Sequence, residues 1–275
     1  MTNTQNDILK LSEIWIYPVK SLGGVSVPSA TILQKGLEHD RRWMLLDEKG
    51  MLLTQRTHPR MALFKTSMHA DHLEIRFAGD VLQMGFEIPA HNSQSTTVWD
   101  DEVSVVPVGA TYDRWFSERM GIDCRLMAFP EDHPRPVESG YADDETHVRL
   151  QDAFPFLVIG QSSLDDLNRK LDSPVPMNRF RPNLVFTGGA PHEEDTWKEI
   201  SIGGLQFTGT RQCVRCSLPT VDQDTGIPGK EPIRTLSTYR KTGNKVMFGM
   251  NLIGPTYGEL RVGDEIEVLV SENIP

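Results

Sequence analysis

Residues 210–226 read Thr210-Arg211-Gln212-Cys213-Val214-Arg215-Cys216-Ser217-Leu218-Pro219-Thr220-Val221-Asp222-Gln223-Asp224-Thr225-Gly226. The stretch holds two of the three cysteines of the chain, together with two arginines and two carboxylates. A thiolate is both a good soft-metal ligand and a good nucleophile, and a neighbouring arginine stabilises its charged form and binds anions. The stretch therefore predicts cysteine chemistry with a metal or an anionic partner. The alternative is a buried Cys-x-x-Cys in a β-turn, which a lone motif of this kind favours.

Zinc and a redox pair make different demands on Cys213 and Cys216. A structural zinc site needs four ligands and usually a second close pair, but Cys124 stands alone and the histidines are scattered. A thioredoxin-like pair opens a helix after a strand, whereas Pro219 and the turn ending at Gly226 favour a loop. A single thiolate ligand to a metal remains. The nearby acids Asp222 and Asp224 are expected to shape the turn.

Composition limits the classes of partner. The chain has 275 residues, which is long enough for one large domain or two modest ones. Its formal net charge is -10. This acidity argues against nucleic acid or an anionic membrane, so any anion site must be a local cluster of cations. An odd number of cysteines does not form a disulfide framework and suits a reducing compartment.

No apolar run approaches the length of a membrane helix, and the polar N-terminal stretch shows no signal or transit peptide. We therefore expect a cytoplasmic protein that does not span a membrane.

Short strands separated by turns are predicted through the first half of the chain. Alternation and β-branched or aromatic residues place them at 11–17, 25–27, 30–33, 43–47, 51–56, 73–77 and 103–107. Helical spacing of large apolar residues predicts a helix over 110–120, closed by Gly121. Residues 129–144 are rich in proline and acids, so we expect an exposed, irregular linker near a domain boundary.

The second half alternates the same kinds of element. Strands are predicted at 156–159, 184–187, 197–202, 205–207, 246–252 and 260–270, with a helix over 162–171 capped by Ser162 or Ser163 and a short helix within 232–239. Many short strands with two or three helices indicate an α+β protein with barrel-like sheets.

Two further polar clusters precede strands. One runs from Asn178 to Asn183, and the other combines Lys20 with Arg41. Singly, such charges are usually only solvated. Together, Lys20, Arg41 and Arg181 provide a possible phosphate clamp.

Five motifs occur in one order along almost the whole chain, which is more specific than any one of them alone. They are Tyr17-Pro18-Val19-Lys20-Ser21, Asp40-Arg41-Arg42-Trp43, Asn178-Arg179-Phe180-Arg181-Pro182-Asn183, Glu194-Asp195-Thr196-Trp197, and Cys213-Val214-Arg215-Cys216 with Thr220 to Gly226. The chain resembles the MOSC family with its N-terminal partner domain, and within it the mitochondrial amidoxime-reducing components and their bacterial homologues.

The resemblance implies a β-barrel MOSC domain over 131–275, packed with a smaller, mostly β N-terminal domain over 9–130. It also implies a molybdenum–pyranopterin cofactor between the two domains, with no role for pyridoxal phosphate. Cys216 aligns with the metal-binding and catalytic cysteine. The residues that the resemblance assigns to cofactor binding are Lys20, Ser21, Arg41, Arg181, Asn183, Arg215 and Cys216.

The implied activity is the reductive removal of oxygen from small N-hydroxylated compounds, such as hydroxylamines and amidoximes. Some bacterial relatives continue into a ferredoxin domain, whereas this chain ends at Pro275, so we expect a separate flavoprotein or ferredoxin-like electron donor. One departure concerns Ala153 and Phe154, because close relatives carry hydroxyl residues there. A side-chain contact from these two positions is lost.

A non-enzymatic role is the alternative. The chain would then carry the cofactor, or carry sulfur on Cys216 as a persulfide. An oxidase direction also stays open, because the metal chemistry is reversible in principle.

Overall fold

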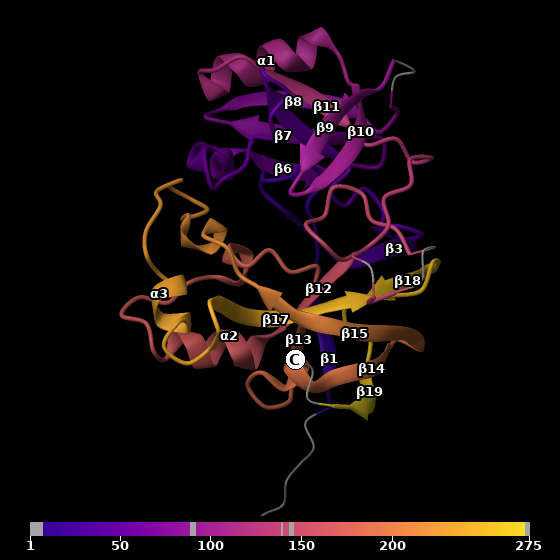
Figure 1. Cartoon of the computed structure of the whole chain (residues 1–275), viewed down its shortest axis with the longest axis vertical. Coiled ribbons are helices and arrows are strands. Elements are labelled where there is room, and N and C mark those ends of the chain that lie inside the picture. The colour runs from indigo at the N-terminus through magenta and orange to yellow at the C-terminus, as the bar shows by residue number, and fades with distance from the viewer. Residues whose placement is uncertain (1–7, 89–91, 139, 143–145, 273–275) are drawn as a thin grey trace, which may run out of the picture.

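The computed structural model describes residues 8–88, 92–138, 140–142 and 146–272, and strands dominate them (Figure 1). The predicted α+β class is confirmed. Residues 1–7 of the polar N-terminal stretch, and Ser139 and 143–144 of the expected linker, lie outside this description. No helix in the described part of the chain is long and apolar enough to cross a bilayer.

The larger sheet joins both ends of the chain. Its strands are β1 (Lys10–Ile16), β2 (Val25–Val27), β12 (Phe156–Gly160), β13 (Leu184–Thr187), β14 (Trp197–Ile202), β15 (Leu205–Val214), β16 (Lys241–Thr242), β17 (Lys245–Ile253) and β19 (Ile266–Ser271). They lie in the order β19-β14-β15-β17-β12-β13-β1-β2, and β16 pairs with β17. β12 and β13 run parallel and are connected through α2 (Gln161–Asn168).

This sheet curls so that its first and last strands meet. Leu11 N donates to Asp264 O at 2.8 Å, and Ile266 N donates to Leu9 O at 2.9 Å. β3 (Ser29–Leu33) pairs with β4 (Gly36–Leu37) on one side and with β18 (Gly258–Arg261) on the other. One apolar core fills the interior, with Trp197, Phe156 and Phe186 among its largest members. The curled sheet is thus the barrel-like unit that the resemblance predicted.

A second lobe is formed by residues 43–128. Its strands are β5 (Trp43–Asp47), β6 (Lys65–Met68), β7 (His72–Phe77), β8 (Asp80–Gly85), β9 (Gln94–Val98), β10 (Asp101–Pro107) and β11 (Cys124–Ala128), with α1 (Ala110–Met120) between the last two. Along β5, Trp43 and Leu45 enter one apolar cluster while Met44 and Leu46 enter another. β5 is therefore buried on both faces, between two cores.

Strand pairing divides the chain differently from the expected domains 9–130 and 131–275. β1 and β3 precede residue 130, yet they pair with β13 and β18 from the second half. The lower lobe in Figure 1 thus takes residues 10–37 and 156–271, and the upper lobe takes 43–128. We propose that the boundary near residue 130 separates two sequence modules. The opening strands of the first module pair with strands of the second.

Three local predictions were wrong. Over 51–56 only Leu52 forms a β-bridge, to Leu46, because the chain turns at Thr54 and Gln55 packs inward. α2 is preceded by Gly160 and has no side-chain cap, because the Ser163 hydroxyl donates instead to buried Glu194. The expected linker is irregular but not exposed throughout, since Arg135 is only 3% exposed.

The remaining helical turns are short. They are α3 (Ile233–Leu236), within the predicted 232–239, and the 3-10 turns Pro59–Leu63, Met177–Arg179, Glu193–Thr196 and Leu218–Thr220. The helix predicted over 110–120 is confirmed, and Gly121 ends it in the left-handed conformation.

Gly249 in β17 makes a test of the packing in the lower lobe. Its φ is +83°, and an added Cβ would meet Ile159 Cγ1 at 2.6 Å and Val158 O at 2.9 Å. We expect Gly249→Ala to destabilise the protein by about 2–5 kcal/mol, because left-handed strain and overpacking add. The free energy of unfolding from denaturant titration measures the effect.

Gly79→Ala is the matched control, because Gly79 has φ +92° with open space around its Cβ position. It should cost only the strain, about 1–2 kcal/mol. Equal losses in the two variants would contradict the packing argument.

Candidate functional site

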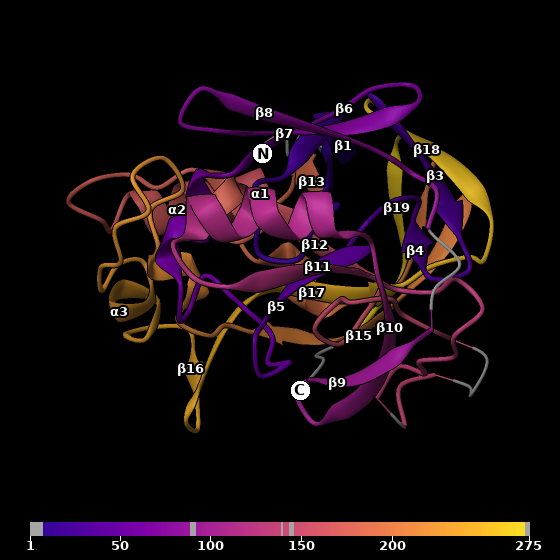
Figure 2. The same cartoon turned by 90° about the horizontal axis from the view of Figure 1, so that it is seen from above.

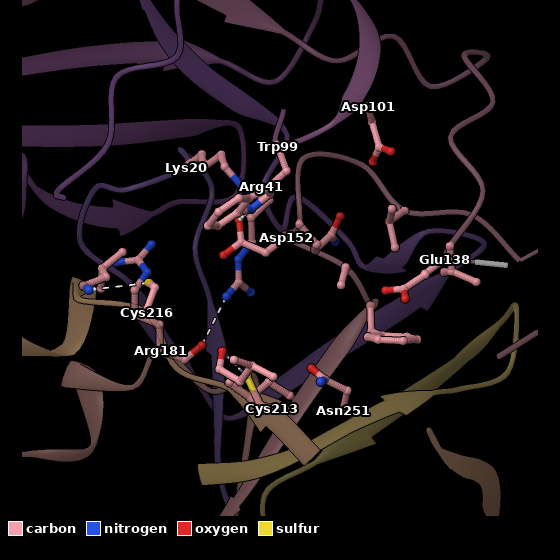
Figure 3. A pocket seen from close by; sticks show the side chains of 18 of the residues that line it. Lys20, Arg41, Trp99, Asp101, Glu138, Asp152, Arg181, Cys213, Cys216 and Asn251 are labelled. Atoms are coloured by element: carbon pink, nitrogen blue, oxygen red, sulfur yellow. Dashed lines mark hydrogen bonds and ion pairs between the residues drawn. The ribbon is translucent and has the colours of Figure 1, made fainter. Parts of the chain in front are cut away.

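A cavity of about 850 Å3 lies between the lobes and is lined by residues from both. Figure 3 shows side chains of the two lobes converging on it. Seven residues that the sequence assigned to cofactor binding all line the cavity: Lys20, Ser21, Arg41, Arg181, Asn183, Arg215 and Cys216. They come from the loop after β1, the turn before β5, the segment before β13 and the loop after β15.

Three of these residues hold an unusual backbone conformation. Ser21, Arg41 and Arg181 have φ values of 67°, 47° and 55°. Non-glycine residues are uncommon in this region and carry strain there, which collects at functional sites. Here the left-handed turns point side chains from separate loops toward one cavity.

Tyr17 holds two of the arginines in position. Its ring lies between the guanidinium groups of Arg41, at 4.3 Å, and Arg181, at 4.2 Å. Arg41 is anchored further, because Nη1 donates to both oxygens of Asp40 at 2.7 Å and Nη2 donates to Arg181 O at 3.1 Å. Arg181 Nη1 donates to Leu22 O at 2.6 Å. The two guanidinium groups are thus fixed before any ligand arrives.

Two cationic side chains that line the cavity are not balanced by carboxylates. Among the described residues, neither Arg181 nor Arg215 forms an ion pair, and Arg181 is only 8% exposed. Burial lowers the pKa of Arg181 to about 10, so it still carries its charge at neutral pH. Arg215 donates from Nη2 to Phe180 O at 2.6 Å, while its buried Nε atom has no hydrogen-bond partner among the residues that the structure describes. A buried cation without a counterion is costly, and an anion in the cavity would relieve that cost.

Lys20 is paired, but with a residue that sequence reasoning missed. Its ammonium donates to Asp152 Oδ1 and to Leu150 O, both at 2.6 Å. Burial lowers the pKa of Lys20. The Asp152 side chain is exposed, and the charge of Lys20 with hydrogen bonds from Lys20 and Trp99 outweighs the effect of desolvation and holds the Asp152 pKa well below its usual range. The Asp152 carboxylate faces the open cavity within the fold and stays ionised at neutral pH.

Asp152, Trp99 and Arg56 were not predicted to belong to the site. Trp99 Nε1 donates to Asp152 Oδ1 at 3.0 Å, and the Arg56 guanidinium lies 4.1 Å from the Trp99 ring. All three line the cavity. Asp152 directly precedes Ala153 and Phe154, the positions that depart from close relatives, and that adjacency was the one available signal.

At Phe154 the lost hydroxyl is replaced by an aromatic wall. The Phe154 ring lies edge-on to Tyr141 at 5.4 Å, and the Arg211 guanidinium is 5.2 Å from each ring. Arg211 in turn pairs with Glu138 at 2.6 Å. Ala153 and Phe154 both line the cavity, so the departure changes its surface from polar to apolar.

The two cysteines of the motif occupy different settings. Cys213 is at the end of β15, and its Sγ accepts a hydrogen bond from Arg215 Nη1 at 3.0 Å. Cys216 follows the strand, and its Sγ accepts, from the residues described, a single hydrogen bond, from Leu218 N at 3.5 Å. Both thiols line the cavity and are free (Figure 3). A single thiol, Cys216, is therefore placed to act as a ligand without breaking an existing strong contact.

Asn183 lines the cavity but uses its amide within the fold. Its Nδ2 donates to Trp15 O at 3.2 Å, and its Oδ1 accepts from Leu157 N at 3.4 Å. Asp222 accepts hydrogen bonds from Thr225 N at 2.8 Å and Asp224 N at 3.1 Å, so the expectation that it shapes the turn is confirmed.

Within the described residues, the one group of three or more side chains arranged to hold a metal is His69, His72 and Glu74. This group lies on the β6–β7 hairpin and contains neither cysteine of the motif. Glu74 is already engaged, because it accepts a hydrogen bond from Arg76 Nε at 2.7 Å. The geometry thus provides no zinc cage at Cys213 and Cys216.

The fold and the cavity define a class of protein: a β-rich chain of two lobes with a cation-lined cavity beside a cysteine thiol. The comparisons with known proteins agree. Residues 8–123 match the MOSC N-terminal beta barrel domain, and residues 145–267 match the MOSC domain. The chain belongs to the MOSC family.

Its curated relatives include mitochondrial amidoxime-reducing component 1. The Mus musculus protein is 34% identical over 94% of this chain and 82% of its own length, and the Homo sapiens protein is 30% identical over 94% and 82%. Molybdenum cofactor sulfurase of Oryza sativa subsp. japonica is 32% identical over 89% of this chain, but over only 32% of its own length. A crystal structure of the YUAD protein from Bacillus subtilis aligns with a TM-score of 0.41 at 11% identity, over 94% of this chain and 93% of that one.

The cation cluster makes a direct prediction about anion binding. Lys20→Ala, Arg41→Ala and Arg181→Ala should each weaken binding of a phosphate monoester by about 1.5–3 kcal/mol, roughly ten- to a hundredfold, because each removes a charge-assisted contact. Calorimetric titration measures the affinity, and a thermal melt checks that each variant is folded.

Arg76→Ala is the control, since Arg76 is largely exposed and pairs with Glu74 away from the cavity. Phosphate binding that is unchanged in all three test variants would show that the cluster has no ligand of this kind.

Proposed function

We propose that the chain binds a molybdenum–pyranopterin cofactor in the cavity and reduces N-hydroxylated compounds there. For a hydroxylamine the balanced reaction is R–NHOH plus two electrons and two protons giving R–NH2 and water; an amidoxime gives an amidine and water in the same way. The observation that carries the proposal is that two guanidinium groups in the cavity, those of buried Arg181 and half-buried Arg215, have no carboxylate partner among the described residues. The Cys216 thiol lines the same cavity. The names of the relatives support the same reading.

The residues fit such a group. Arg41, Arg181 and Lys20 would hold its phosphate, and Arg215, which has no carboxylate partner among the described residues, lines the same cavity. Cys216 would supply the thiolate ligand, because soft sulfur suits a metal of this kind. When bound, the cofactor supplies two-electron oxygen-transfer chemistry, which no side chain of the protein can supply.

The protein itself binds the cofactor and the substrate and orients the substrate in the cavity. Lys20 keeps Asp152 ionised, so the Asp152 carboxylate can accept a hydrogen bond in the cavity from an N–H or O–H group. Phe154, which lines the cavity and packs against Tyr141, offers an apolar surface to the rest of the substrate. Protons enter from solvent through the open side of the cavity.

Electrons come from a separate protein in this proposal. An iron–sulfur cluster of the ferredoxin kind needs four cysteines, and this chain has three. All three are free thiols, which supports a reducing compartment such as the cytoplasm.

The two cysteines should respond differently to substitution. Cys216→Ala should abolish molybdenum retention or turnover, while Cys213→Ala should keep most of both, because one thiolate satisfies the metal. Molybdenum per chain, from elemental analysis of purified protein, is the readout. Equal loss in both variants would point to a paired site and sink the assignment of Cys216.

A reduction assay separates the enzyme from a carrier of cofactor or sulfur. Cofactor-loaded protein should reduce benzamidoxime when given reduced methyl viologen, and should not oxidise NADH by itself, since nothing in the chain passes electrons from a hydride donor. The Cys216→Ala variant should fail under the same conditions. If fully loaded protein with a competent donor turns over no N-hydroxylated compound, the carrier role replaces the reductase.

A further inference from the structure

The hairpin of β16 and β17 projects from the lower lobe (Figure 2). Every residue from Lys241 to Lys245 is exposed. Immediately after it, Val246 O accepts a hydrogen bond from Arg215 N at 2.8 Å, and Met247 lies opposite Val214 in the sheet. The hairpin is therefore joined by one backbone hydrogen bond to the residue that precedes Cys216.

A second exposed segment flanks the same loop. Pro228 forms a β-bridge with Val221, and Gly229 N donates to Thr220 O at 2.9 Å. This pairing holds Lys230 and Ile227 beside the turn that follows Cys216, and Ile227 is 65% exposed. Val214, 41% exposed, is at the cavity end of the strand.

These segments carry positive charge on an acidic protein. Residues 214–247 contain six lysines and arginines against three carboxylates, whereas the whole chain has a net charge of -10. Each of the three carboxylates already has a cation partner: Asp222 with Arg179, Asp224 with Lys65 and Glu231 with Arg234. Among the residues described, Lys230, Lys241 and Lys245 form no ion pair. We call these three lysines, with Ile227 and Val214, the basic face.

We propose that the basic face is the docking surface for an acidic one-electron redox protein that supplies the reductase. This inference rests on the proposed function, because it concerns how that reaction receives its electrons. An acidic partner is steered to an unpaired basic patch, and the exposed apolar residues among the lysines give it a contact to desolvate. Docking here brings the partner's redox centre to the loop that carries Cys216.

The electron balance agrees with such a partner. Each turnover consumes two electrons and two protons, so a one-electron carrier docks twice and leaves oxidised each time. Short encounters of this kind use small interfaces that depend on charge, rather than large apolar ones. Exposed lysines and two exposed aliphatic residues, in segments that flank the cysteine loop, match that pattern.

The test compares two double charge reversals in cofactor-loaded protein. Lys241→Glu with Lys245→Glu reverses two of the three lysine charges of the basic face, while Lys10→Glu with Lys49→Glu makes the same change in net charge outside residues 214–247. The probe is a reduced, acidic plant-type [2Fe–2S] ferredoxin. At low salt the first variant should lose about tenfold or more in the second-order rate of ferredoxin oxidation, and the control should lose much less. The difference should shrink at high salt, because screening removes the steering.

Two further measurements decide between outcomes. Benzamidoxime reduction with methyl viologen should be the same in wild type and both variants, because a small donor needs no docking surface. Binding of oxidised ferredoxin, followed by fluorescence anisotropy, should weaken only in the basic-face variant. The docking surface would be overturned if the two variants oxidised ferredoxin at the same rate. It would also be overturned if the basic-face variant lost as much benzamidoxime reduction with methyl viologen as it loses with ferredoxin. Absence of benzamidoxime reduction in the wild type would instead overturn the proposed function, and the binding measurement would still judge the surface.

Discussion

The Arg181 guanidinium, buried between the two lobes, has no carboxylate partner among the residues that the structure describes, and the rest of the site depends on this constraint. Burying an unpaired charge costs several kcal/mol, about what a buried ion loses in hydration. The fold offsets part of this with the Tyr17 ring at 4.2 Å and the Leu22 carbonyl at 2.6 Å. Neither contact neutralises the charge, so the cavity retains a demand for an anion. A phosphate group, as in the proposed ligand, would meet that demand.

The position of this charge follows from the crossing of the chain between the lobes. β1 belongs to the lower sheet, the loop after it supplies Lys20, and the chain then enters the upper lobe at β5 just after Arg41. The second module returns to the same place with Arg181 before β13 and Cys216 after β15. Because both modules contribute strands to the lower sheet, the relative position of their loops is set by backbone pairing rather than by a flexible linker.

The charges of the molecule separate into two groups with different surroundings. In the cavity, Lys20 and Arg41 have carboxylate partners, while Arg181 and Arg215 have none within the described part of the chain, which suits the binding of an anion. On the surface beside the cysteine loop, the lysines at 230, 241 and 245 are exposed and unpaired among the described residues. One group favours tight binding in low dielectric, and the other favours rapid, salt-sensitive encounter.

Local sequence determined much of the fold. Periodicity located α1 and its glycine stop as well as most strands, because these signals depend on neighbours within one or two turns. The five ordered motifs identified the family and brought seven cavity residues to attention before any distance was known. Where a residue's fate depended on a distant partner, local patterns failed: Gln55 turned inward to bond Ser21 O and Gln223, and Ser163 bonded Glu194 instead of capping a helix.

Only the tertiary structure decided which of the charges are paired. Lys20 and Asp152 are 132 positions apart, so no local pattern joins them, and the same holds for the stacking of Arg181 on Tyr17. Periodicity likewise does not predict that the opening strands join the sheet of the second module, because a strand pattern indicates that one face is buried but not against which sheet. The sequence thus determined which elements form and which residues are available for chemistry, whereas long-range pairing decided which charges are left for a ligand.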